Sequence, residues 1–199
     1  MSIMSDIEIE KYCRDLEDSN SLNGMKSPMI MPYIDKQVRE INGRKILSYG
    51  SSAMGYDVRL DTKFKIFTNI NSTIIDPLDF SEQSLVDHEG DFCIVPPNSY
   101  ILGLTIETFN IPRNVMVLCV GKSTLARAGA IINTTPIEPG FEGKVVIEIS
   151  NATPLPLKIH ANMGIAQFLF FKSEIPCRTS YADKNGKYQG QNTLTLAKV

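Results

Sequence analysis

The chain has 199 residues, of which 43% are hydrophobic and 21% charged, and this length suits one compact domain with a sizeable core. Its formal net charge is -2, so no general positive field would draw in nucleic acid. No apolar run approaches the roughly 18 to 20 residues that span a bilayer, and the first residues lack the basic and apolar parts of a secretory signal. We therefore expect a cytoplasmic protein with neither a membrane nor a nucleic-acid partner.

A short amphipathic helix is expected at the start of the chain. Ser5 and Glu8 fit a capping box, in which the serine side chain accepts a backbone N–H and the glutamate returns the bond. Met4 and Ile9 fit the hydrophobic staple that accompanies such a cap. We expect the helix to end before the Ser-Asn-Ser run at 19–21, because these residues favour turns.

The next stretch, residues 20–48, mixes Pro, Gly, Asn and charged residues. We interpret it as an extended arm or an irregular connection. Helix and arm together make residues 1–48 the N-terminal part of a single domain that spans 1–199.

Beyond the arm the pattern is that of β-strands separated by turns. Asp57 and Arg59 fall on the same side of the first strand, after a glycine-marked turn, where they could pair with each other. Many short apolar runs with Pro and Gly between them favour a β-sandwich, a jelly roll or a distorted barrel. The further candidate strands are 63–70, 92–95, 99–106, 115–120, 130–134, 144–150, 155–161, 164–172 and 177–181.

The segment Gly121–Arg127 reads Gly-Lys-Ser-Thr-Leu-Ala-Arg and follows the apolar strand at 115–120. It is not a P-loop, because the Walker pattern needs a glycine five positions before the first residue of this segment, where Met116 stands. What remains is a strand-end turn whose Lys122, two hydroxyls and free backbone N–H groups suit a phosphate, or else an ordinary polar turn. A short helix is expected to follow over 125–129.

Glu148 lies inside the apolar strand Val145–Ile149. Strand alternation places residues 146, 148 and 150 on one face and 145, 147 and 149 on the other. A carboxylate on a largely apolar strand costs desolvation energy unless it is paired or used chemically. Phosphate-binding groups followed by such an acid indicate chemistry on a nucleotide.

Two later segments carry further polar groups. Glu138 precedes a proline, which holds it extended, and its carboxylate could accept hydrogen bonds from a sugar hydroxyl. The C-terminal segment 183–199 is polar and glycine-rich over its first part. It is either a disordered end or a mobile flap that brings Lys187, Tyr188 and Gln191 over a ligand.

A zinc site is poorly supplied. His88 and His160 are the two histidines of the chain, and the cysteines form no Cys-x-x-Cys pair. Zinc-dependent deaminases of nucleobases need a Pro-Cys-x-x-Cys element. Here Pro176 and Cys177 begin that element, but Ser180 occupies the place of its second cysteine. We therefore expect no zinc.

Taken together, these motifs resemble the trimeric dUTPase superfamily, and specifically its dCTP deaminase branch. The resemblance implies a distorted β jelly roll or barrel of the dUTPase type with a short N-terminal helix. It also implies a homotrimer with active sites between subunits. The matching blocks are Gly55-Tyr56-Asp57, Gly121 to Arg127, Ile137 to Gly140 running into Ile147-Glu148, Ala161 to Gln167, and Lys187 to Gln191.

The resemblance further implies zinc-independent hydrolysis of dCTP to dUTP and ammonia, which supplies dUTP for dUMP and dTTP synthesis. Glu148 would be the catalytic acid/base, Arg127 would orient the reacting groups, and Ser123 would help to hold the attacking water. Lys122 would contact the triphosphate, and Glu138 the deoxyribose. Mg²⁺ would be bound through the substrate triphosphate. The residues expected at the substrate are Lys122, Ser123, Thr124, Leu125, Ala126, Arg127, Glu138, Val146, Ile147, Glu148, Gln167, Tyr181, Lys187 and Gln191.

Two other functions remain open. The first is a dUTP pyrophosphatase, or a bifunctional dCTP deaminase and dUTPase. Because dUTPases and many deaminases have aspartate where this chain has Glu138, the longer side chain argues against pyrophosphate release. The second is a non-catalytic β-trimer that binds nucleotides or proteins, which the intact acid and cations disfavour.

Overall fold

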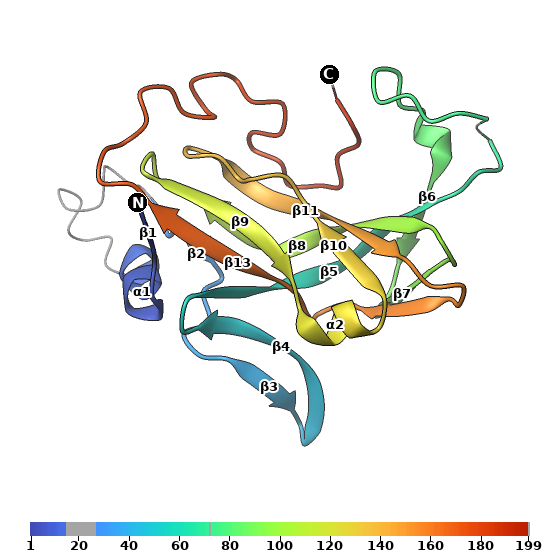
Figure 1. Cartoon of the computed structure of the whole chain (residues 1–199), viewed down its shortest axis with the longest axis horizontal. Coiled ribbons are helices and arrows are strands. Elements are labelled where there is room, and N and C mark those ends of the chain that lie inside the picture. Colours follow the sequence, from blue (N-terminus) through green and yellow to red (C-terminus); the bar gives the residue numbers. More distant parts are fainter. Residues whose placement is uncertain (15–26, 72, 199) are drawn as a thin grey trace.

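The computed structural model describes residues 1–14, 27–71 and 73–198. Strands dominate, and Figure 1 shows them curling around one interior, with the short helices at the periphery. The elements are β1 (Ser2–Ile3), α1 (Asp6–Arg14), β2 (Ile30–Met31), β3 (Val38–Ile41), β4 (Arg44–Ser52), β5 (Gly55–Phe67), the 3₁₀ helix η1 (Glu82–Ser84), β6 (Leu85–Glu89), β7 (Phe92–Val95), β8 (Tyr100–Asn110), β9 (Val115–Gly121), α2 (Ser123–Arg127), β10 (Ala130–Asn133), β11 (Glu142–Asn151), β12 (Leu157–His160) and β13 (Gly164–Lys172).

Most strands belong to one 11-stranded sheet whose main path runs β1-β13-β5-β8-β11-β10. The long strand β5 joins its two halves, because its first part pairs with β13 and its second part with β8. Strand β9 also pairs with β13, while β7 and β12 form a separate two-stranded sheet. The prediction of a mainly β fold with a curled sheet is confirmed.

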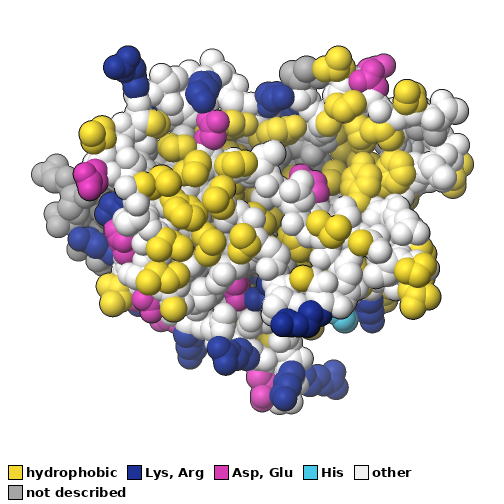
Figure 2. All heavy atoms as spheres, in the orientation of Figure 1, with side chains coloured by type: hydrophobic (Ala, Val, Ile, Leu, Met, Phe, Trp, Pro, Cys, Tyr) yellow, Lys and Arg dark blue, Asp and Glu magenta, His cyan; other side chains and the backbone are white. Residues whose placement is uncertain are grey.

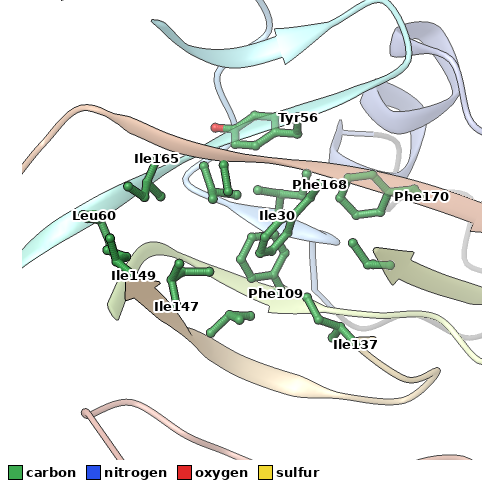
Figure 3. Packing of buried hydrophobic residues seen from close by; sticks show 14 of the residues in the cluster. Ile30, Tyr56, Leu60, Phe109, Ile137, Ile147, Ile149, Ile165, Phe168 and Phe170 are labelled. Atoms are coloured by element: carbon green, nitrogen blue, oxygen red, sulfur yellow. The ribbon is translucent and has the colours of Figure 1, made fainter. Parts of the chain in front are cut away.

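The core fills the space inside the curled sheet. Phe109 of β8 and Phe168 of β13 meet there, with ring centroids 5.1 Å apart. Figure 3 shows Ile147 and Ile149 of β11 in the same interior, with Leu60 of β5 beside Ile149. The side chain of Ile147 is fully buried, so a contact between this residue and a substrate would have to come from its backbone.

The predicted N-terminal helix is confirmed as α1. The hydroxyl of Ser5 accepts the backbone N–H of Glu8 at 3.4 Å, as expected for a cap. Met4 and Ile9, the expected staple, are both fully buried. The predicted end of the helix lies outside the described residues.

Residues 20–48 were interpreted as an extended arm or an irregular connection, and the second alternative is wrong for the part that the structure describes, since β2, β3 and the start of β4 lie there. Strands β3 and β4 form a hairpin. Its turn is the dipeptide Asn42-Gly43, with φ of 49° and 75°. Two positive φ angles in succession are typical of a type I′ hairpin turn, for which Asn-Gly is a strong local signal. Residues 20–26 lie outside the described residues.

The predicted strand at 177–181 is also wrong. The N–H of Cys177 donates to the carbonyl of Arg113 at 2.9 Å, and the N–H of Tyr181 donates to the carbonyl of Pro139 at 2.8 Å. The segment therefore bonds to loops rather than to a neighbouring strand. Conversely, β6 was not predicted, because its outward charged residues hide the alternation on which strand prediction depends.

Candidate active site

Glu148 stands on β11, on the face that looks away from the core. Its cross-strand neighbours are Leu102 of β8 and Asn133 of β10. The residues on either side of it in the sequence, Ile147 and Ile149, are fully buried on the opposite face. The predicted alternation of β11 is therefore confirmed, and it places a carboxylate on an outward face between one apolar and one polar neighbour.

A cavity of about 360 Å³ opens over this face. It brings together five of the residues that the sequence analysis expected at the substrate: Glu138, Val146, Glu148, Tyr181 and Gln191. Other lining residues had no sequence signal, because they come from loops and from the outward face of β8. They include Phe80, Tyr100, Leu102, Thr134, Thr135, Phe141 and Leu196, while Tyr188, which was expected in the C-terminal flap, also lines the cavity.

The carboxylate of Glu148 is desolvated. Its Oε2 atom is buried and has no hydrogen-bond partner among the described residues. Burial raises the pKa of Glu148 from 4.5 to about 7. A carboxyl group with a pKa near neutrality can accept a proton and return it during one reaction, as a general acid/base must.

The predicted phosphate-binding segment lies apart from this cavity. Lys122 directly precedes α2, and its Nζ donates to Oδ2 of Asp57 at 2.5 Å and to Oγ of Ser48 at 3.2 Å. The expected pairing of Asp57 with Arg59 is therefore wrong. Arg59 instead donates from Nε to Oε1 of Glu107 at 2.7 Å.

The short helix expected at 125–129 is present as α2, shifted by two residues toward the N-terminus. Ser123, Thr124, Ala126 and Arg127 are exposed, whereas Leu125 is buried. The Nη1 atom of Arg127 donates to the carbonyl of Ser123 at 3.3 Å. None of these α2 residues is among those that line the Glu148 cavity within the described part of the chain.

Gln167 belongs with Lys122 rather than with Glu148. On β13 it pairs with Asp57 of β5 on one side and Val120 of β9 on the other. Its Nε2 donates to Oγ of Ser52 at 2.8 Å. The candidate residues thus form two groups in the chain, one around Glu148 and one around Lys122.

The C-terminal segment runs across the end of β11, where Gly143 and Gln191 form a parallel bridge. Figure 1 shows this segment in red along the rim of the sheet near β9, β10 and β11. The side chains expected to meet a ligand make contacts within the chain. Lys184 Nζ reaches Oε2 of Glu138 at 2.8 Å, and Lys187 Nζ donates to the carbonyl of Lys198 at 2.8 Å.

Among the described residues, no three or more His, Cys, Asp or Glu side chains are placed so that they could hold a metal ion. In the same part of the chain, no helix has the length and apolar character needed to cross a membrane.

Comparison with known proteins gives a consistent result. The family model described as dCTP deaminase-like matches residues 16–173. A dCTP deaminase of Cupriavidus pinatubonensis is 55% identical over 199 residues, which is 100% of both chains. A dCTP deaminase of Francisella tularensis subsp. novicida is 59% identical over 170 residues, covering 85% of this chain and 90% of the relative.

A solved structure shares the fold. The crystal structure of 2'-deoxycytidine 5'-triphosphate deaminase from Agrobacterium tumefaciens superposes with a TM-score of 0.55 at 15% sequence identity. The match covers 86% of this chain and 48% of the solved chain. This likeness confirms the predicted jelly-roll type of the fold.

Proposed function

The chain belongs to the dCTP deaminase-like family, and we propose on that premise that it hydrolyses dCTP to dUTP and ammonia. The observation that carries the proposal is the desolvated carboxylate of Glu148 in the cavity of β11, whose pKa burial raises to about 7. Such a group is suited to activating water beside a pyrimidine ring.

In the proposed mechanism, water attacks C4 of cytosine while Glu148 takes one of its protons. The protonated carboxyl then passes that proton to ring N3, which gives a tetrahedral adduct. Transfer of the hydroxyl proton of the adduct to the amine, again through Glu148, lets the C4–N bond break. The products are the uracil carbonyl and ammonia. Ser123 is assigned to holding the water and Arg127 to orienting Glu148.

We further propose a homotrimer in which α2 of one copy completes the Glu148 cavity of its neighbour. Two observations support this assembly. Ser123 and Arg127 do not line the Glu148 cavity of their own chain. In addition, the outward face of β9 and β13 is apolar, and Figure 2 shows hydrophobic side chains gathered over this part of the surface. Its partly exposed residues are Met116, Leu118, Val120, Leu169 and Phe171.

Mixing two inactive variants tests the shared site. Glu148→Gln and Arg127→Ala should each lack activity, while copies refolded together should regain about a quarter of the sites, because half of the copies supply each intact group. Sedimentation should give the mass of a trimer. A monomeric mass, or no recovery on mixing, would contradict the shared site.

Mg²⁺ is proposed to bind through oxygens of the substrate triphosphate. Lys122, Arg127 and Lys187 cannot neutralise a triphosphate by themselves, and Mg²⁺ commonly binds phosphates with few protein ligands. Its role would be to reduce the repulsion that the triphosphate meets at the site. Treatment with EDTA should raise the KM for dCTP, and added Mg²⁺ should restore it. Recovery with Zn²⁺ alone would indicate a different chemistry.

An end-point assay with dCTP and dUTP tests the reaction itself. Release of ammonia from dCTP without pyrophosphate supports the proposal. Pyrophosphate from dUTP would support the pyrophosphatase or the bifunctional enzyme. Nucleotide binding without any turnover would support a non-catalytic protein.

A further inference from the structure

A network of polar side chains lies where the β3–β4 hairpin meets β5. We propose that Asp57 is a positioning residue, which holds the ammonium group of Lys122 at the place where it receives the substrate triphosphate. The inference rests on the proposed function in one respect, the triphosphate nature of the ligand. Asp57 itself would touch neither the substrate nor the reacting atoms.

Asp57 is almost completely buried, with 2% of the residue exposed. A carboxylate in such a place is tolerated only with partners. Its Oδ2 atom accepts from Lys122 Nζ at 2.5 Å, from Gln37 Nε2 at 2.9 Å and from Ser48 Oγ at 3.5 Å. The carboxylate of Asp57 is therefore anchored by donors from three separate segments, and one of these donors is the ammonium group of Lys122.

Lys122 is held at two points. An ammonium group carries three N–H donors, and the contacts with Asp57 and Ser48 use two of them in the described part of the chain. One donor is left for a ligand oxygen. Because the side chain is only 13% exposed, its direction is set by these partners rather than by solvent.

The network also fixes the elements that surround the lysine. The carbonyl of Lys122 accepts the N–H of Ala126, so Lys122 is the N-cap residue of α2 and directly precedes Ser123. On the other side, Gln167 lies opposite Asp57 across the β5–β13 pair and donates to Ser52 of β4. The hairpin thus supports two side chains that were expected at the substrate, Lys122 and Gln167.

The ion pair between Asp57 and Lys122 predicts the direction in which phosphate affinity changes when Asp57 is replaced. Replacing Asp57 by asparagine removes a negative charge beside the proposed phosphate site, and net charge alone would then favour a tighter grip on an anion. If Asp57 positions Lys122, the same substitution lets the lysine side chain move and lowers the affinity for the phosphate ligand. The two explanations thus give opposite results.

Calorimetric titration with inorganic tripolyphosphate in the presence of Mg²⁺ measures this directly. We expect Asp57→Asn to weaken tripolyphosphate binding about ten-fold, the size typical of a misplaced charge-assisted hydrogen bond. Binding of deoxycytidine, which has no phosphate, should be unchanged. In a Lys122→Met background, Asp57→Asn should add less than about two-fold, because the group that it positions is gone.

Glu107→Gln is the matched control. Glu107 is a second buried acid, on β8, paired with Arg59 of β5, and no contact with Lys122 is present in the described structure. Its variant should lower the melting temperature without changing tripolyphosphate affinity. If Asp57→Asn does not fold, Ser48→Ala decides, because it removes the second acceptor of Lys122 and should weaken binding two- to three-fold, as about one neutral hydrogen bond.

Unchanged or tighter tripolyphosphate binding in the folded Asp57→Asn protein overturns the positioning role, as does an equal loss in Glu107→Gln. Absence of tripolyphosphate binding in the unmodified protein overturns it as well. Failure of the unmodified protein to release ammonia from dCTP would instead refute the proposed reaction, since the titrations do not depend on turnover.

Discussion

The cavity over β11 and the network beneath the β3–β4 hairpin each contain an acidic side chain, and the surroundings of these two acids differ. Glu148 faces an apolar cavity and leaves Oε2 without a hydrogen-bond partner among the described residues. Asp57 is more deeply buried, yet Lys122, Gln37 and Ser48 all donate to it. Both side chains are withdrawn from solvent, and they differ in the number of groups that donate hydrogen bonds to them.

Burial raises the pKa of Glu148 to about 7, within reach of proton transfer at neutral pH. Burial with a cation and two further donors gives an acid that organises its neighbours. Glu107 belongs to the second kind, since it is fully buried and paired with Arg59 at 2.7 Å. Burial also raises the pKa of Glu107, so the presence of a cation, and not the direction of the pKa shift, distinguishes this paired acid from Glu148.

The largest effect is expected from Glu148→Gln. Turnover of dCTP should fall by about 10²–10⁴-fold, because amide cannot transfer the protons, while substrate binding should persist. Ammonia release and nucleotide affinity are to be measured together. Glu142→Gln is the control, since Glu142 is exposed on the same strand, and it should keep full activity. Near-normal turnover in Glu148→Gln would contradict the assignment of proton transfer to Glu148.

Breaking the pair between Arg59 and Glu107 should reduce stability rather than chemistry. Arg59→Met leaves a fully buried carboxylate without its cation, and such a change typically costs about 3–5 kcal/mol of unfolding free energy. Urea titration measures the loss. The double variant Arg59→Met/Glu107→Gln should recover much of it, because no buried charge is then left. A double variant no more stable than Arg59→Met would indicate that packing, and not charge, is responsible.

The pH dependence of activity and of stability tests the raised pKa of Glu148. As a base it must be deprotonated, so kcat/KM should rise about ten-fold per pH unit below its pKa of about 7 and then level off. The unfolding free energy should change with pH in the opposite direction. A pKa raised from 4.5 to about 7 stabilises the folded state at low pH, and this contribution is lost as the pH rises from 4.5 to about 7. Glu148→Gln should therefore gain stability relative to the unmodified protein at pH 8 compared with pH 5. If the unfolding free energy of the two proteins changed with pH in the same way, the raised pKa of Glu148 would be contradicted.

The smallest effect is expected at the exposed ion pair between Lys184 and Glu138, which joins atoms 2.8 Å apart. Lys184→Met should change the melting temperature by less than about 2 °C, because exposed pairs are screened by water. The KM for dCTP should change less than about three-fold. Lys187→Met, three residues later, is the comparison and should raise KM more, as expected for a phosphate contact. If Lys184→Met has the larger effect on KM, the pair with Lys184 sets the position of Glu138.

Local patterns allowed much of the β11 region to be predicted. The alternation of Val145 to Ile149 indicated which face Glu148 would occupy, and the structure has it there. The start of the N-terminal helix at Ser5 was equally predictable, because a helix cap joins residues that are three positions apart in the sequence. The Asn42-Gly43 dipeptide also carries a local signal for a hairpin turn, although it lies within a polar stretch.

Partners distant in sequence were not predictable in the same way. Asp57 was expected to pair with Arg59, two residues away, but it pairs with Lys122, 65 residues away. The segment 177–181 has the composition of a strand, yet its backbone bonds to Arg113 and Pro139. In each case several partners are chemically equivalent, and the one that the sheet brings close forms the bond.

The sequence by itself determined which residue types were available and which face of each strand they would occupy, because side-chain direction follows from the two-residue period of the backbone. Only the tertiary structure decided that Oε2 of Glu148 has no hydrogen-bond partner among the described residues while Oδ2 of Asp57 has three, because strand pairing and hairpin packing bring Gln37, Ser48 and Lys122 to Asp57. The pKa of a buried acid depends on those neighbours in space, which no local pattern specifies.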